Sequence, residues 1–512
     1  MQAKIQDGIT ASGSQIACSN CHRRSGLGSS ESGINSPPVT AERLFRDEGS
    51  EAEALYGRRN LRADARPAYT NESLARAIVQ GIDPTGASLH ALMPRYELGS
   101  EALAAITAYL RSMSATPSPG VTDSDLHIAT VVTDDATPAD RASMLAVLEA
   151  FFADKNAGTR GEARRARYAP TQRKWHYAAH RNWRLHVWEL TGAAHGWRQQ
   201  LDRLYAAQPV FALVSGVSAS GWKPVHDFCE REAVPCLFPN TALPALGDRD
   251  YYTVYFSRGV TQDAGALVRH LVDEASSPAA GERTVVMQVA RNTELGLGAA
   301  NALRAAAQRH PQLTVVTRIV DENELTDQRL MASLETTRDV DHVVLWLGPE
   351  VPRLLAELSA APQVQPKTIV VSSRFLGQGA SDALARLGGD IRSRIRIVHP
   401  FALDATDSRS AHSIRRWLGA KGIEMQNARI ELDTHYAVTM LARAVKHMAG
   451  NFSRDYLLEK IEHQIDKSLH TAMYEHLSLG PSQRYASKRC QILALHQDPD
   501  KPHVRLNTIT AP

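Results

Sequence analysis

Two cysteines and a histidine near the start of the chain form its most specific chemical pattern. Two residues separate Cys18 from Cys21, and His22 follows directly. This C-x-x-C-H spacing is that of a c-type haem attachment site, in which two thiols bond to one porphyrin and the adjoining imidazole ligates its iron. A thioredoxin-like redox pair and half of a zinc site are the alternatives. The residues before Cys18 lack the βαβ pattern of the first, and no further cysteine precedes Cys229, as the second would require.

A haem iron held in this way usually takes a second axial ligand, and the downstream candidates are Met93, His90 and Met113. We favour Met93, because Pro94 holds the residue before it out of a helix and a thioether on a rigid loop suits the role. Ligation by His and Met raises the potential of the iron, whereas His90 would give a bis-histidine haem of lower potential. A core methionine is the alternative interpretation of Met93.

Residues 1–113 resemble a class I cytochrome c domain. The resemblance rests on the cysteine–histidine motif, on Pro37-Pro38, on an expected helix over Asn71–Gln80, on Met93-Pro94 and on a closing helix that ends near Leu110. It implies an all-α domain with one covalent haem c, attached at Cys18 and Cys21, with His22 and Met93 as axial ligands of the iron. In that family a proline carbonyl commonly accepts the hydrogen bond of the proximal imidazole, and we expect Pro38, or Pro37, to do so.

The composition indicates a globular protein of several domains. The chain has 512 residues, is 43% hydrophobic, and carries 58 Lys+Arg against 55 Asp+Glu, for a net charge of +3. The charge gives no argument for nucleic acid, and no apolar run is long enough to span a membrane. The sequence opens without the apolar core of an export signal. The stretch Ser112–Asp125 is small, polar and contains two prolines, so we expect a linker at 114–124.

Beyond the linker, short apolar runs alternate with amphipathic helical patterns. This alternation predicts an α/β domain over 125–512, with a parallel sheet in each of two lobes. The expected strands are 126–132, 185–190, 210–214, 285–289, 313–320, 342–347, 368–371 and 395–398, and the expected helices are 138–155, 223–232, 262–272, 298–309 and 352–358.

The order of these elements resembles the type I periplasmic binding proteins, the Leu/Ile/Val-binding family of ABC-transporter receptors. The resemblance implies a ligand between the lobes and chain crossings near 255–262 and in the 370–405 region. In the first lobe, Ser218, Ala219 and Ser220 would form an anion-binding turn. The remaining residues that the resemblance places at the cleft are Asn240, Thr241, Ser257, Arg258, Arg291, Asn292, Trp346, Ser373 and Arg374.

One departure from the family bears on the ligand. Amino-acid binders usually place an acidic residue against the ligand ammonium, where this chain has Ser372-Ser373-Arg374. An arginine in place of a glutamate argues against a zwitterionic amino acid, and predicts an anionic or neutral ligand or none.

Two further features remain outside the motifs. Cys229 and Cys236 would form a disulfide in an oxidising compartment, with a buried thiol pair as the alternative. The stretch Arg160–Arg184 holds eight Lys/Arg and one acidic residue, Glu162. We interpret it as an ordinary solvated loop, or as a docking patch for an acidic partner or for the cytochrome domain of the same chain, and not as a nucleic-acid stripe.

Together these patterns predict a periplasmic mono-haem electron carrier that is not an enzyme, fused to a solute-binding-like domain. By analogy with quinoprotein systems, its redox partner would be a PQQ-dependent dehydrogenase, and a small-molecule ligand could occupy the cleft. The alternative is the solute receptor of an ABC importer or sensor, with an accessory haem.

Overall fold

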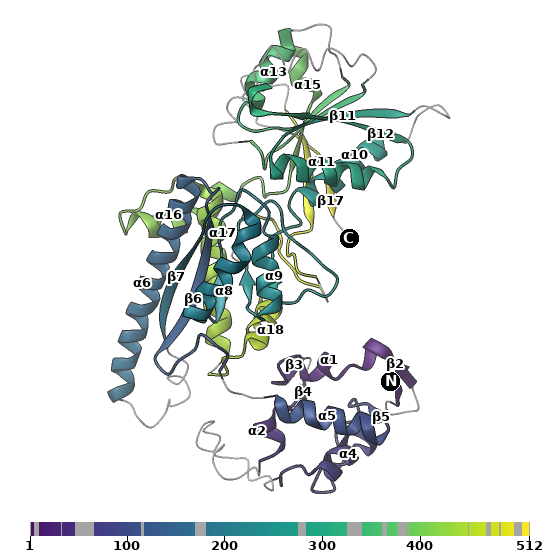
Figure 1. The fold of residues 1–512 in the computed structure, drawn as a ribbon, viewed down its shortest axis with the longest axis vertical. Coiled ribbons are helices and arrows are strands. Elements are labelled where there is room, and N and C mark those ends of the chain that lie inside the picture. The colour runs from purple at the N-terminus through teal and green to yellow at the C-terminus, as the bar shows by residue number, and fades with distance from the viewer. Residues whose placement is uncertain are drawn as a thin grey trace.

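Three bodies follow one another along the long axis of the molecule (Figure 1). A small N-terminal domain lies at one end, the first α/β lobe lies in the middle, and the second lobe lies at the other end. The computed structural model describes the chain apart from residues 1, 5–9, 32, 47–65, 114–116, 169–180, 275–282, 325–339, 361–365, 377–383, 385–386, 388, 449, 467–472, 481–482, 496–503 and 511–512.

The N-terminal domain packs two helices and several short segments around a small core. Helix α4 (Asn71–Gln80) starts at a capping box between Thr70 and Ser73 and ends at Gly81, whose φ of 70° lies in the left-handed region. Helix α5 (Ser100–Ser112) follows, and α1 (Cys18–His22) and α2 (Ala41–Leu44) are single turns. The buried core consists of Ile16, Leu44, Leu74, Ile78 and Tyr96.

This domain is not all-α, so that part of the fold prediction is wrong. Strand β1 (Gln2–Lys4) pairs antiparallel with both β2 (Thr10–Ser12) and β5 (Arg95–Glu97). A second ribbon joins β3 (Ser29–Glu31) to β4 (Ile34–Ser36). Each strand has three residues, which is too short for an alternation of apolar and polar residues to stand out in the sequence.

The first lobe contains a parallel five-stranded sheet in the order β10-β9-β8-β6-β7. Strand β6 is buried along nearly its whole length, as expected for a central strand with helices on both faces. The bounds are β6 Asp125–Thr133, β7 Asn182–Leu190, β8 Ala212–Val214, β9 Cys236–Leu237 and β10 Thr253–Val254.

Two layers of helices cover this sheet. One core packs side chains of α6 (Pro138–Tyr168), α16 (Arg409–Gly419), α17 (Ala428–His447) and α18 (Arg454–Ile465) against it. The other core involves α8 (Trp197–Ala207) and α9 (Lys223–Arg231). Helix α6 is longer than predicted, because residues 158–168 are rich in good helix formers. Of the proposed basic patch at 160–184, the side chains of 160–180 lie outside the described residues. Arg181 donates to the Thr122 carbonyl at 2.6 Å, and Arg184 on β7 pairs with Asp125 at 2.6 Å.

The second lobe has a seven-stranded sheet in the order β12-β11-β13-β14-β15-β16-β17. Strand β16 runs antiparallel to both of its neighbours, β15 and β17. Helices α10 (Val260–Glu274) and α11 (Glu294–Ala307) share one core, and α13 (Val351–Ala360) and α15 (Gly389–Arg394) share the other. The strand bounds are β11 Thr284–Arg291, β12 Leu313–Val320, β13 His342–Trp346, β14 Thr368–Ser372, β15 Ile395–His399, β16 Arg489–Ala494 and β17 Val504–Thr510.

Within the described residues, the chain passes between the lobes at three places. It leaves β10 for α10, returns from β15 to α16, and passes again from α18 to β16. The first and third passages lie side by side, because Tyr255 donates its N–H to the Arg484 carbonyl at 2.8 Å and accepts from Ala486 at 3.0 Å. The third passage had no counterpart in the sequence prediction, which did not identify β16 and β17.

Candidate ligand site between the lobes

The strand order of the first lobe marks the place where a ligand crevice forms. Strand β6 lies between β7 and β8, so the connections that leave β6 and β8 run to opposite faces of the sheet. Asp135 follows β6, and the turn Ser218–Ser220 follows β8. A parallel bridge between Val132 and Val217 holds the two loops together at this edge. The turn predicted from the family resemblance therefore lies at the switch point of the sheet.

A carboxylate of the chain itself occupies this turn. The Ala219 N–H donates to Asp135 Oδ1 over 3.4 Å, and the hydroxyls of Ser220 and Thr133 both donate to the Asp135 carboxylate. The Ser218 hydroxyl is turned to the Ser220 carbonyl, at 3.2 Å. Asp135 remains exposed. The donors expected to receive a ligand anion are thus already engaged with an anion from the loop after β6.

The second lobe has a switch point of the same kind, and an ion pair lies at it. Strand β11 lies between β12 and β13, which makes the loops after β11 and β13 the corresponding crevice. Arg291, at the end of β11, pairs with Glu350 after β13 at 2.9 Å, with side chains 29% and 19% exposed. Asn292 donates its side-chain amide to Asp321 Oδ1 at 2.6 Å. Both predicted ligand residues therefore contact acidic side chains of the same lobe.

The two crevices meet at Gly221 and Glu294. Gly221 is buried directly after the first-lobe turn, and Glu294 begins α11 behind the N-cap Thr293. A Cβ at Gly221 would lie 2.4 Å from Glu294 Oε1, so the end of the Glu294 side chain lies directly against the turn. The carboxylates of Asp135 and Glu294 thus both lie beside the 218–221 turn.

The other predicted ligand residues of the first lobe contact their own or neighbouring segments. Asn240 lies beside Val217 through a parallel bridge and is 7% exposed. Thr241 accepts from the Leu243 N–H at 3.1 Å, and buried Ser257 accepts from Gly259 at 3.2 Å. The Arg258 guanidinium stacks over the Tyr485 ring at 5.5 Å, where two interlobe passages adjoin. Of this group, only Asn240 shares the strand-end edge with the turn.

In the second lobe, three predicted ligand residues lie in or beside the core. Trp346 is fully buried and donates its indole N–H to Gln288 at 2.9 Å. Ser373 hydrogen-bonds the His399 ring at 2.9 Å.

The Arg374 side chain is 3% exposed and pairs with fully buried Asp263 at 3.1 Å. Burial by itself would lower the pKa of Arg374, but the Asp263 carboxylate and Tyr474 raise it above its ordinary value. An arginine neutralised in this way does not attract a ligand anion, so the sequence argument for an anionic ligand loses its main residue.

Cys229 and Cys236 are both fully buried, on α9 and β9. Burial and the neighbouring Cys236 raise the pKa of the Cys229 thiol well above its ordinary value. The structure holds the pair as adjacent thiols without a bond between them, and the disulfide stays a prediction.

The N-terminal motif presents its three side chains from one helical turn. Cys18 and Cys21 are exposed, and His22 Nδ1 lies 2.9 Å from the Pro37 carbonyl. The proline that contacts the imidazole is therefore Pro37 and not Pro38. This hydrogen bond orients the ring and leaves Nε2 for a metal, so these residues fit a haem iron.

The segments that carry the candidate distal ligands lie close to the motif. Tyr96, three residues after Met93, lies 3.7 Å from the Cys18 sulfur through its hydroxyl. Met93 is half-buried and His90 is exposed. The Met113 side chain packs on Gly26, where a Cβ would lie 2.4 Å from its methyl carbon. The choice among the three ligands stays a prediction.

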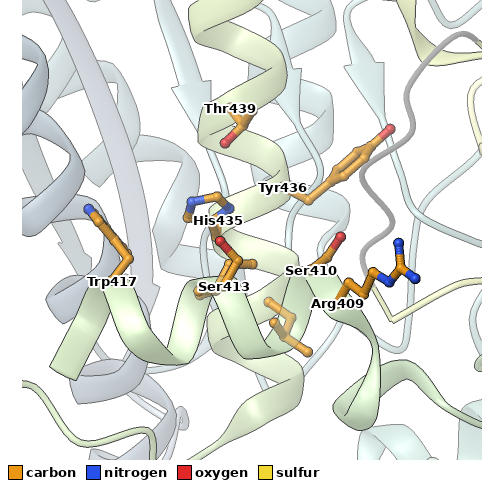
Figure 2. Close-up of a pocket in the computed structure, with 9 residues that line it drawn as sticks. Arg409, Ser410, Ser413, Trp417, His435, Tyr436 and Thr439 are labelled. Atoms are coloured by element: carbon orange, nitrogen blue, oxygen red, sulfur yellow. The ribbon is translucent and has the colours of Figure 1, made fainter. Parts of the chain in front are cut away.

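A separate pocket of about 370 Å³ lies between α16 and α17 (Figure 2). Its aromatic wall is formed by Trp417 and His435, whose ring centroids lie 5.3 Å apart, and both rings contact Phe151 of α6. It shares no residue with the interlobe site. The lining consists of Arg409, Ser410, Ser413, Ile414, Trp417, Leu432, His435, Tyr436 and Thr439.

No protein family model and no curated protein sequence matches the chain. Solved structures do match. A fatty acid ABC transporter substrate-binding protein from Thermomonospora curvata aligns with a TM-score of 0.53 at 15% identity, over 78% of this chain and 95% of its own. A possible leucine/isoleucine/valine-binding protein from Rhodopirellula baltica aligns with a TM-score of 0.51 at 18% identity, over 77% of this chain and 98% of its own. A branched-chain amino acid ABC transporter protein from Thermus thermophilus with bound valine aligns with a TM-score of 0.52 at 12% identity, over 76% of this chain and 97% of its own.

The chain has the two-lobed α/β fold of type I periplasmic binding proteins. That part of the fold prediction is confirmed, and the first two solved proteins that share the fold are named as binding proteins. No helix among the described residues is long and apolar enough to cross a membrane.

The prediction of an electron-transfer cytochrome as the main function is wrong. About three quarters of the chain aligns with substrate-binding proteins of ABC transporters, which favours the alternative of a solute receptor. The prediction of a PQQ-dependent dehydrogenase as electron donor depended on the electron-transfer function, and no similar structure supports it. The described residues contain no group of three His, Cys, Asp or Glu side chains that could hold a metal ion. A haem bound by one His and one Met forms no such group, so the haem stays a prediction.

The acidic residues of the site were missed by the sequence prediction. Asp135, Glu294 and Glu350 each follow a strand by a few residues, at the carboxyl edge of their sheet. That position is the signal that could have identified them, because parallel strands deliver the residues after them to one edge.

Proposed function

We propose that this protein is a periplasmic solute-binding receptor of a transport or sensing system. The observation that carries the proposal is the meeting of the two switch-point crevices at Gly221 and Glu294, where both lobes offer polar side chains to one interlobe site. Relatives in fold include a protein with bound valine and a periplasmic substrate-binding protein from Ralstonia solanacearum. A ligand between lobes that contacts both would favour their closed arrangement, and closure is the signal that a transporter or sensor can read.

A solute screen tests this proposal. The full-length protein is screened by thermal shift against small organic solutes, hits are confirmed by calorimetry, and closure is followed by small-angle X-ray scattering. Ala219→Trp should abolish binding, because Ala219 is exposed in the turn and the indole would fill the crevice. Ala207→Trp, on the exposed end of α8, is the matched control and should bind normally. Hits that Ala219→Trp leaves unchanged would contradict the proposed site.

We also propose that the N-terminal domain carries one accessory haem c, attached at Cys18 and Cys21. The exposed thiols on one helical turn and the contact of His22 with Pro37 support this proposal. When bound, the group supplies an iron that takes an axial imidazole. Pro37 orients the imidazole, and Met93 is the proposed second ligand.

Covalent haem is attached outside the cytoplasm, which agrees with the proposed location. Protein from a host with the haem-maturation system should show a c-type spectrum after dithionite reduction. Cys18→Ser with Cys21→Ser should remove it, and Cys490→Ser should retain it. Met93→Ala should abolish the near-infrared band of Met-ligated ferric haem; a colourless wild-type protein would contradict the cofactor.

A further inference from the structure

The pocket between α16 and α17 is formed by one face of each helix (Figure 2). Its lining residues on α16 recur at helical spacing, as Ser410, Ser413 and Trp417. On α17, Leu432 and Thr439 lie two turns apart. The volume of about 370 Å³ falls within the range of about 300–1,000 Å³ that is usual for small-molecule sites. The pocket is therefore large enough for one small organic molecule.

One end of the pocket is a fixed aromatic surface. The Trp417 indole donates its N–H to Asp154 at 2.8 Å, which holds the ring in place. His435 packs edge-on against Trp417, with ring centroids 5.3 Å apart, and against Phe151, with centroids 6.0 Å apart. Rings that their neighbours already hold lose little freedom when a ligand binds. A ligand ring gains edge-to-face or offset contacts on such a surface, so this end favours an aromatic group.

The opposite end of the pocket is positively charged. Helix α16 begins at Arg409, whose exposed guanidinium has no ion-pair partner among the described residues. The described residues that line the pocket include this one guanidinium and no carboxylate. Figure 2 shows Arg409 and Trp417 at opposite ends of the lining row on α16, with Ser410 and Ser413 between them. Eight helical steps separate the two, or about 12 Å, so an elongated ligand with a ring at one end and an anionic group at the other fits.

A hydroxyl of the pocket lacks a hydrogen-bond partner. Thr439 Oγ1 is enclosed, yet it has no partner among the described residues. Figure 2 shows this hydroxyl turned toward His435, beside the aromatic end. Threonine inside a helix commonly bonds the carbonyl four residues earlier, and Thr439 makes no such bond in the described structure. Because a buried hydroxyl without a partner is costly, a ligand with a polar group at this point would gain stability from it.

We propose that this pocket is a second ligand site of the first lobe, and that its ligand is an aromatic carboxylate with a hydroxyl group on the ring. The ring packs on Trp417 and His435, the carboxylate pairs with Arg409, and the ring hydroxyl forms a hydrogen bond with Thr439. The pocket shares no residue with the interlobe site, so the inference does not depend on the proposed receptor function.

The test uses four probes that differ in one group at a time. The principal probe is 3-(4-hydroxyphenyl)propanoate. Its amide, 3-(4-hydroxyphenyl)propanamide, lacks the charge, 3-phenylpropanoate lacks the ring hydroxyl, and 3-cyclohexylpropanoate lacks the aromatic ring. Titration calorimetry of the full-length protein at pH 7 and low ionic strength should find the principal probe the tightest, by about threefold or more over each of the others. Added salt should narrow its advantage over the amide, because Arg409 is exposed.

Three variants and one control locate the site. Ser413→Trp places an indole in the pocket from an exposed position and should abolish binding of the principal probe. Arg409→Gln should weaken it about threefold and remove the preference over the amide. Thr439→Val keeps the shape of the side chain and should remove the preference over 3-phenylpropanoate. Arg416→Gln is the matched control for charge, because Arg416 is exposed on the same helix outside the pocket, and it should bind normally.

The Ala219→Trp variant separates this pocket from the interlobe site. It blocks the interlobe crevice and should leave binding of the principal probe unchanged. Binding that Ala219→Trp abolishes and Ser413→Trp retains would assign the probe to the interlobe site and overturn the inference. Failure of all four probes to bind the wild-type protein, or equal binding of the acid and its amide, would overturn it as well. None of these results bears on the receptor function, which the solute screen tests.

Discussion

The Glu459 carboxylate accepts two hydrogen bonds from Ser25, one from its main-chain N–H and one from its hydroxyl, each 2.7 Å long. Ser25 lies three residues after His22, and Glu459 lies on α18 of the first lobe. A neighbouring ion pair joins Arg24 to Asp455 at 3.4 Å, and the Arg24 guanidinium stacks over the Tyr251 ring at 4.2 Å. The loop after the cysteine–histidine motif thus docks the N-terminal domain on the first lobe.

Removing the Ser25 hydroxyl should loosen this docking. Ser25→Ala deletes one hydrogen bond to a largely buried carboxylate and should cost about 1.5–3 kcal/mol of docking free energy. Hydrogen exchange of residues 22–28 and of α18 in the full-length protein measures it, and both segments should exchange faster. Ser29→Ala is the matched control, because that hydroxyl bonds the Cys21 carbonyl within the N-terminal domain. Equal exchange in Ser25→Ala and wild type would contradict the docking role.

The docking should also depend on pH. Burial, with the nearby carboxylates of Asp455 and Glu462, raises the pKa of Glu459 to about 7, although the hydrogen bonds from Ser25 act in the opposite direction. Undocking exposes Glu459 and returns its pKa to the ordinary range near 4.5. The docked form therefore binds the proton more tightly, so the added stability is complete below the ordinary pKa and is lost as pH rises through about 7.

The other groups that face Glu459 set a limit on this effect. Arg484 pairs with Glu462 at 2.7 Å and stacks over the Tyr251 ring at 4.8 Å, so it offsets part of the negative charge beside Glu459. Hydrogen exchange of residues 22–28, corrected for the intrinsic pH dependence, should show more protection at pH 5.5 than at pH 8. Glu459→Gln should remove most of the difference. Protection that increases with pH would show that the sign is wrong.

The Arg374–Asp263 pair should behave as a structural element. Arg374→Ala leaves a carboxylate of zero exposure without its cation, which should cost about 3–5 kcal/mol of unfolding free energy. Urea unfolding of the second lobe measures it. Arg374→Ala with Asp263→Ala should recover part of the loss, because no unpaired charge then remains. A variant that loses solute binding at unchanged stability would instead identify Arg374 as a ligand residue.

Arg454 should be required for the position of α18. Its guanidinium is buried and donates to the carbonyls of Val210, Pro119 and Glu232, at 2.6, 3.2 and 3.1 Å, which joins the linker to the first lobe at Pro119. Arg454→Ala leaves these carbonyls without a donor and should lower the unfolding free energy by at least about 2 kcal/mol. Thermal unfolding measures the loss. Lys460→Ala, on the same helix, should have little effect.

Local patterns were sufficient for much of the α/β fold. Val285–Val289 and Leu313–Val320 were predicted as strands from short apolar runs, and β11 and β12 contain them. The same approach missed β16 and β17, and β16 pairs with β15, from which two interlobe passages separate it along the chain. Pairing between distant segments stabilises such elements, and no local periodicity records it.

The sequence by itself determined the spacing of the cysteine–histidine motif and the alternation of strands and helices. Thiols separated by two residues and an adjoining imidazole are defined by spacing along one helical turn, and burial on both faces makes a parallel strand continuously apolar. Only the tertiary structure decided the charges of the interlobe site. Asp135 reaches the 218–220 turn, and Asp263 neutralises Arg374, across 85 and 111 positions of the chain. Whether a charged side chain is available to a ligand depends on its partner in space.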